Sequence, residues 1–196
     1  MINNKYLNEM KDTVNKFYNA LKMAKQEIDR NNGIYLPDIA KGENDKVLER
    51  LRLAERAAEE EIDNTTAKAI EAVEKWKALS GKEIDDADLK LLQGAFKLES
   101  EDIEALVEKH KDNGTMIRAI KDYAEDHNIM AVIPTPEAKI KAYSVIAREA
   151  KDTLATIERS ITNTEDSFTG FSIENIVGGF LNPETKVFGQ NLSVLL

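Results

Sequence analysis

Two stretches of this chain place apolar residues at spacings that alternate between three and four, and no other feature constrains the fold as strongly. Such spacing keeps the apolar side chains of a stretch along one side of an α-helix. We call the two stretches the first seam and the second seam. The first seam consists of Leu7, Met10, Val14, Phe17, Leu21, Ala24 and Ile28. The second seam consists of Ile140, Tyr143, Ala147, Ala150, Leu154, Ile157 and Ile161.

A longer helical pattern lies between the seams and runs from about Pro37 to Leu79. Consecutive steps of four between Ala54 and Thr66 predict a local relaxation of any supercoil. Each seam is only three heptads long, which favours an intramolecular core over an intermolecular coiled coil. The sequence therefore predicts an all-α fold, an elongated antiparallel helical bundle with long coiled-coil-like helices, in which both seams pack against the central helix.

Changes in residue composition and in the spacing of apolar residues divide the chain into four parts. We expect two long helices in 1–80, a module of short helices in 81–133, a third long bundle helix in 134–161 and an apolar C-terminal arm in 162–196. The first long helix should stop at Asn31-Asn32-Gly33. Capping patterns predict three short helices in the module and the start of the third long helix. They are Asp86 to Gln93, Glu101 to Lys111 with Ser100 as N-cap, Met116 to His127 with Thr115 as N-cap, and a helix opened by Thr135 and Pro136.

Charge and composition exclude several classes of function. The net charge is -9 and 32% of the residues are charged, so the average field opposes binding to nucleic acid and to anionic membranes. The chain has no cysteine, which excludes disulfides and cysteine-based metal sites. The longest uninterrupted apolar run is Ile129 to Ile133, so we also expect no membrane span.

No motif in the sequence predicts catalysis, a cofactor or a metal. His110 and His127 do not have the spacing of a metal-binding pair, and we expect His110 to be a surface or capping residue near the end of a helix. Asp85, Asp86 and Asp88 resemble the opening of a calcium loop, but the required Gly and Glu are missing, so we interpret them as a helix N-terminus. The sequence thus predicts a non-enzymatic protein.

The C-terminal arm carries four of the six Phe residues, in a stretch interrupted by Gly and polar residues. One interpretation is that its apolar side chains fold back and cover an end of the bundle. The other is that they form a partner-binding or dimer-swapped arm, since clustered aromatic and aliphatic side chains anchor interfaces. Both interpretations remain open. The candidate partner-binding residues are Phe168, Phe171, Ile173, Ile176, Val177, Phe180, Leu181, Val187 and Phe188.

Three strings, "YLPDIAKGENDKVLERL", "LLQGAFKLESEDIEALVEKHKDNGTMIRAIKDYAEDHN" and "IPTPEAKIKAY", resemble uncharacterised proteins encoded by tailed phages and prophages of Gram-positive bacteria. The resemblance covers most of Lys5 to Tyr143 and, more loosely, "KVFG" near the end. Such proteins are often encoded among genes for head formation. The resemblance therefore implies a phage structural or assembly-associated role, in the host cytoplasm or associated with the virion, and it assigns no functional residue.

On this basis the expected partner is a protein, either a second copy in a homodimer or a phage structural protein, with the C-terminal arm as the association element. The alternative is a phage-encoded inhibitor of a host protein that acts through its acidic helical surface. No cofactor is expected in either case.

Overall fold

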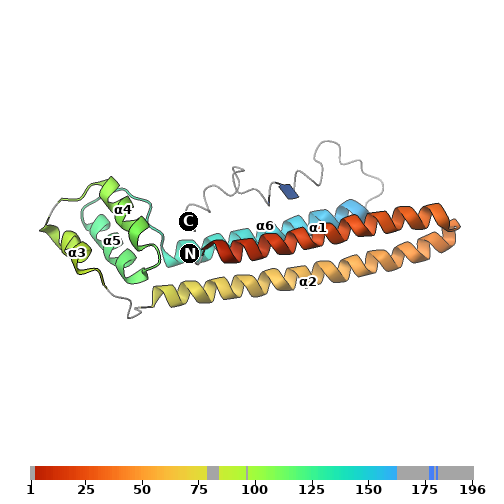
Figure 1. Ribbon diagram of the computed structural model, residues 1–196, viewed down its shortest axis with the longest axis horizontal. Helices are drawn as coiled ribbons and strands as arrows, with labels where there is room; N and C mark the ends of the chain where they lie inside the picture. The colour runs from red at the N-terminus through yellow and green to blue at the C-terminus, as the bar shows by residue number, and fades with distance from the viewer. Residues whose placement is uncertain (1–2, 79–83, 96, 163–176, 179, 181–196) are drawn as a thin grey trace.

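The computed structural model describes residues 3–78, 84–95, 97–162, 177–178 and 180. Within these residues all regular structure is helical, which confirms the all-α prediction. Three long helices lie side by side in an elongated bundle, and the shorter elements gather at one end of it (Figure 1). The long helices are α1 (Asn3–Ile34), α2 (Pro37–Lys77) and α6 (Pro136–Thr162). The shorter elements, which we call the module, are α3 (Asp86–Lys90), the π-helical turn η1 (Leu91–Ala95), α4 (Ser100–His110) and α5 (Gly114–Asp126).

Helices α1 and α2 form an antiparallel hairpin. The Lys16 ammonium lies 3.6 Å from the Glu61 carboxylate, and Arg50 lies 2.7 Å from Glu27. The residue numbers rise in α1 as they fall in α2, which is the register of two helices running in opposite directions. With 41 residues, α2 is continuous and about 60 Å long.

Helix α6 packs against the same hairpin and also runs antiparallel to α2 (Figure 1). Lys151 lies 2.5 Å from Asp63, and near the other end of α6 Glu137 lies 3.8 Å from Lys77. The end of α2 and the start of α6 therefore meet beside the module. The module is an insertion between these two helices.

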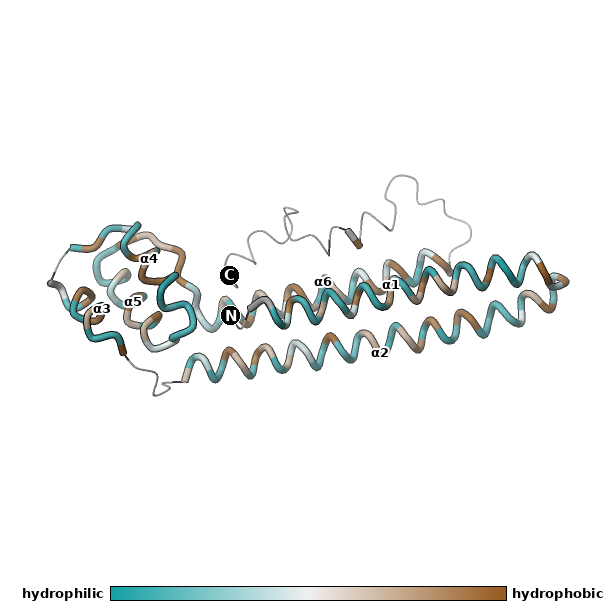
Figure 2. The backbone as a smooth tube through the Cα atoms, viewed as in Figure 1, coloured by the Kyte–Doolittle hydropathy of each residue, from teal (hydrophilic) through white to brown (hydrophobic). Residues whose placement is uncertain are grey.

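The apolar faces of the three long helices form the first of two cores. Both seams contribute to it along their whole length: their central residues are buried, while Ile28, Ile140 and Ile161 are partly buried against the core. In α2 the buried residue after Ile62 is Thr65 rather than the expected Thr66, so only the last of the predicted steps of four is absent. Figure 2 shows the alternation of hydrophobic and hydrophilic positions along each long helix.

A second core lies inside the module. Ile103 and Leu106 of α4 pack with Ile117 and Ile120 of α5. Trp76, at the end of α2, belongs to this second core although its helix is part of the bundle. Its indole Nε1 donates a hydrogen bond to the carbonyl oxygen of Lys111 at 3.2 Å. Trp76 thus connects the bundle to the module.

Several predicted helix ends are displaced in the structure. The N-cap of α4 is Glu99, which forms a capping box with Asp102, and Ser100 is the first residue of the helix. The N-cap of α5 is Asn113, whose side chain accepts a hydrogen bond from the Met116 amide. The expected caps Ser100 and Thr115 were wrong because each follows, by one and two positions respectively, a residue that can also accept from the first turn.

Two further boundaries differ from the expectation. Helix α1 does not stop at Asn31 but continues through Gly33 to Ile34. The first module helix is shorter than expected, because α3 ends at Lys90 and the following turn contains Gly94 with φ of 95°. That left-handed conformation favours glycine and is incompatible with a continuing α-helix.

Candidate functional site

Two of the nine candidate residues of the C-terminal arm lie within the described structure. Val177 and Phe180 are only 2% and 4% exposed, and both belong to the core of the bundle. The other seven candidates, Phe168, Phe171, Ile173, Ile176, Leu181, Val187 and Phe188, lie outside the described residues. Val177 and Phe180 therefore contribute to the intramolecular core, and partner binding by the arm stays a prediction.

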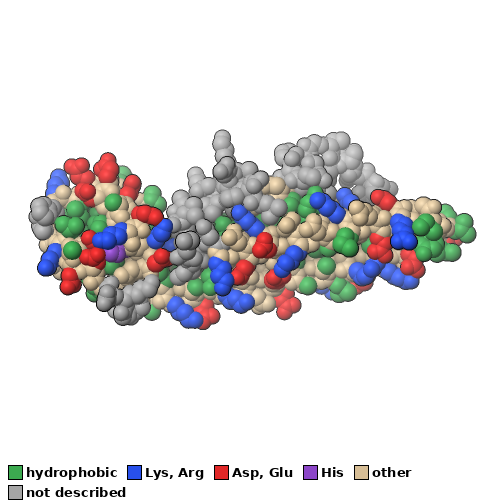
Figure 3. Space-filling view, in the orientation of Figure 1, with side chains coloured by type: hydrophobic (Ala, Val, Ile, Leu, Met, Phe, Trp, Pro, Cys, Tyr) green, Lys and Arg blue, Asp and Glu red, His purple; other side chains and the backbone are tan. Residues whose placement is uncertain are grey.

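The most exposed apolar cluster of the bundle lies at the α1–α2 turn, at the end away from the module. Ile34 is 63% exposed, Tyr35 45%, Leu36 73% and Ile39 54%. We call these four residues the apolar tip. Figure 3 shows hydrophobic side chains gathered at this end of the molecule. Contiguous exposed apolar side chains are uncommon on a protein surface unless they contact something else.

The apolar tip has a defined conformation because the turn beneath it is short and bonded. Only Tyr35 and Leu36 separate the two helices. Below the turn, Asn44 accepts a hydrogen bond from Asn31 Nδ2 at 3.0 Å and donates one to Asn32 at 2.8 Å. Asn31 itself is buried. These side-chain bonds join α1 to α2 and hold the tip in place.

Sequence reasoning did not identify the apolar tip. The signal was present, because "IYLPDI" places large apolar residues directly after Asn31-Asn32-Gly33, where polar turn residues are usual. The three-dimensional position at the far end of the bundle follows from the hairpin and cannot be read from the local pattern.

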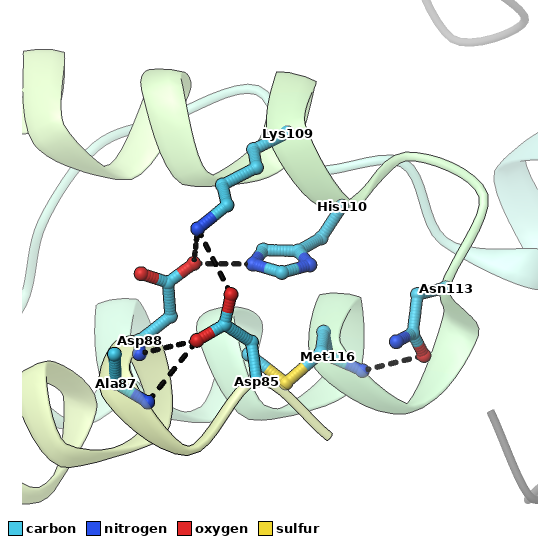
Figure 4. A network of polar contacts seen from close by, with 7 residues as sticks. All are labelled: Asp85, Ala87, Asp88, Lys109, His110, Asn113 and Met116. Carbon is cyan, nitrogen blue, oxygen red and sulfur yellow. Dashed lines mark hydrogen bonds and ion pairs between the residues drawn. The ribbon is translucent and has the colours of Figure 1, made fainter. Parts of the chain in front are cut away.

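A cluster of four charged or titratable residues lies in the module, where α3 meets the end of α4 (Figure 4). Lys109 Nζ lies 3.0 Å from Asp85 and 2.6 Å from Asp88. His110 Nε2 lies 2.5 Å from the same Asp88 oxygen. Asp85 also caps α3, because its carboxylate accepts hydrogen bonds from the amides of Ala87 and Asp88. The interpretation of Asp85 as a helix N-terminus is thus confirmed.

The interpretation of His110 as a surface or capping residue was wrong. His110 is 8% exposed and Asp88 is 7% exposed, so the pair is buried. The hydrogen bond from Lys109, and then that from His110, lowers the pKa of Asp88 below its ordinary value. Sequence reasoning missed this pair because its members are 22 residues apart and come together only when α3 packs on α4.

The cluster also has the dimensions of a small metal site. One ligand atom each from Asp85, Asp88 and His110 lie within 4.8 Å of one another. However, the Lys109 ammonium is bonded to both carboxylates, and it offsets one of their two negative charges (Figure 4). We therefore interpret the cluster as a structural link between α3 and α4.

A groove of about 260 Å³ lies at the junction of bundle and module. Trp76 lines it, together with Gly114 at the start of α5 and Pro136 at the start of α6. The buried Lys139 places its ammonium 5.1 Å from the centre of the Trp76 ring, and burial lowers the pKa of this lysine. Gly114 packs directly against the Trp76 carbonyl, where a Cβ atom would lie 2.1 Å from the oxygen.

A second, open groove of about 450 Å³ runs between α1 and α2. Its charged lining is mainly acidic. Glu9, Asp12, Glu60 and Glu61 contribute carboxylates, and Lys16 and Lys68 contribute ammonium groups.

Among the helices that the structure describes, none combines the length and the apolar character needed to cross a membrane. Comparison with models of protein families, with curated proteins and with solved structures found no match.

Proposed function

We propose that this chain is a non-enzymatic interaction protein that acts in the assembly of a phage particle. The observation that carries the proposal is the apolar tip, four exposed apolar side chains presented on a hydrogen-bonded turn at the end of a long bundle. A rigid apolar surface of this kind loses little conformational entropy when a partner covers it. The assembly role is supported by the resemblance of the sequence to phage proteins.

The shape of the molecule supports the same function. The bundle separates the apolar tip from the module by about the length of α2, roughly 60 Å. An elongated protein with different surfaces at its two ends can join or space other proteins. The C-terminal arm, a further candidate association element, follows α6, which ends at Thr162.

The proposal is tested by co-sedimentation of the purified chain with coat-type proteins encoded in the same phage genome. We expect binding by the intact chain and at least tenfold weaker binding by Leu36→Ser, which makes the apolar tip polar. Met130→Ser is the matched control, because Met130 is 91% exposed but lies after α5, away from the apolar tip. Absence of binding to every head protein, or equal binding by both variants, would contradict the proposal.

An inhibitor of a host nucleic-acid enzyme is the second candidate, favoured by the acidic groove between α1 and α2. Carboxylates from both helices gather there, including Glu9 and Glu61. Capture through such a surface should weaken strongly between low and high salt, because exposed charges are screened. Capture through the apolar tip should change little. The salt dependence of binding therefore separates the two functions.

A further inference from the structure

The structure around the apolar tip indicates which partner fits it. The two ends of the molecule differ in charge: residues 23–46, which contain the hairpin end, carry four Lys or Arg and five Asp or Glu residues. Their net charge is -1, whereas residues 84–133 at the other end carry six Lys or Arg and twelve Asp or Glu residues, a net charge of -6. Two copies of this acidic molecule would repel each other in most orientations. End-to-end contact through the hairpins minimises that repulsion.

The charged residues beside the apolar tip are balanced in sign. Asp29 and Arg30 precede it on α1, and Asp38 and Lys41 flank Ile39 on α2. All four are exposed, and within the described part of the chain none of them forms an ion pair at 4.0 Å or less. The tip thus has an apolar centre and a rim with two unpaired cations and two unpaired anions. Apolar centres with polar rims are the usual anatomy of protein interfaces.

We propose that the apolar tip binds the apolar tip of a second copy, in an end-to-end homodimer with the two modules at opposite ends. A two-fold axis perpendicular to the long axis of the bundle and to the plane of the α1–α2 hairpin would place the end of α1 of each copy against the start of α2 of the other. The rim of each copy would then face charges of both signs on the rim of the other copy, and the apolar side chains of the two tips would cover one another. This inference rests on the proposed function because it uses the same surface, and a coat protein that binds the apolar tip would compete with the second copy.

The size of the tip sets the strength of this contact. Stable dimers usually bury about 800 Å² on each partner. Four side chains at the end of a hairpin provide less than that, so the dimer should be weak and should depend on concentration. In the end-to-end arrangement the two acidic modules lie far apart. Exposed charges more than about 8 Å apart are largely screened at physiological salt, so repulsion between the modules opposes the dimer little.

Sedimentation velocity of the full chain over a concentration series provides the first test. We expect reversible dimerisation that Leu36→Ser weakens at least tenfold, while Met130→Ser leaves it unchanged. A chain that stays monomeric up to about 0.5 mM would overturn the inference. The same holds for a dimer that both variants weaken equally, because the contact would not then be specific to the tip.

Charge reversal tests the rim. Asp29→Lys leaves the rim with three cations and one anion, and Lys41→Glu leaves it with one cation and three anions. The double variant again has two cations and two anions. Each single change suits the dipole of its own helix end, so neither should impair folding. We expect weaker dimerisation in each single variant and recovery in the double variant. Lack of recovery would overturn the self-complementary arrangement.

Cysteine cross-linking locates the contact directly, because the chain has no cysteine of its own. Under a mild oxidant that accepts the two electrons of thiol oxidation, Leu36→Cys should form a disulfide-linked dimer much faster than Met130→Cys. Equal rates would overturn the inference. If Leu36→Ser abolishes binding of a coat protein while the wild-type chain remains monomeric, the second copy is rejected as the partner and the proposed function survives.

Discussion

Glycine has opposite consequences at two positions in this molecule. A Cβ atom on Gly42, within α2, would meet nothing within 4 Å, whereas one on Gly114 would collide with the Trp76 carbonyl oxygen. Gly42 therefore weakens its helix without a packing reason, because glycine has the greatest backbone freedom to lose. Gly114 is required by the close approach of α5 to the end of α2.

The matched substitutions Gly42→Ala and Gly114→Ala test this difference. We expect Gly42→Ala to raise the free energy of unfolding by about 0.5 to 1 kcal/mol. Gly114→Ala should lower it by about 1 to 3 kcal/mol, because the backbone at the junction must move to admit the methyl group. Urea unfolding measures both. Similar effects from the two changes would contradict the packing described at Gly114.

The buried pair of Asp88 and His110 predicts a specific response to acid. The pKa of Asp88 is lowered in the folded protein, first by Lys109 and then by His110. Its stabilising contribution is therefore fully present above the ordinary carboxyl pKa near 4 and is lost as the pH falls through the lower folded value. Acid should weaken the attachment of α3 to α4.

Asp88→Asn removes this titration while keeping the size of the side chain. Between pH 7 and pH 3 the loss of unfolding free energy should be smaller in Asp88→Asn than in the wild-type protein. Asp86→Asn, an exposed change in the same helix, should behave like the wild type. Urea titrations followed at both pH values give the comparison, and an unchanged acid response in Asp88→Asn would exclude the pair as its source.

At the scale of the structural elements, Phe180 itself contributes to the bundle. Phe180 is 4% exposed and packs in the core formed by the three long helices. Phe180→Ala should lower the free energy of unfolding by about 3 to 5 kcal/mol through lost burial and a residual cavity. Ile39→Ala at the exposed tip should change it by less than about 0.5 kcal/mol. Calorimetry of the monomer at low concentration measures both, and a neutral Phe180→Ala would remove this residue from the core.

The long helices and their buried faces could be predicted from the sequence because the spacing of their apolar residues repeats along each helix. The seam from Leu7 to Ile28 repeats the pair of steps of three and four three times, so one misplaced residue does not change the result. Helix ends depend on single residues, and nearby candidates such as Asn113 and Thr115, two positions apart, compete. The contact of Asp88 with His110 depends on how two short helices pack, which no local pattern encodes.

At the scale of the whole molecule, the two cores are joined by few contacts, and Trp76 is central among them. It is the only tryptophan in the chain, so its fluorescence reports on the module and the junction. Far-ultraviolet circular dichroism is dominated by the three long helices. We expect the two signals to give different urea midpoints, with the fluorescence transition first because the module core is smaller. Coincident transitions would show that the two cores unfold as one unit.

The antiparallel register of α2 and α6 brings Lys77 and Glu137 within 3.8 Å of each other beside the module. A loop of about five residues could therefore close the bundle where residues 78–135 now lie. We expect a chain with this replacement to remain helical and cooperative, and loss of its thermal transition would show that the bundle depends on the insertion. An insertion point of this kind allows the module to be exchanged without a change in the bundle. Modules could therefore diversify in evolution while the bundle and its apolar tip keep the same structure.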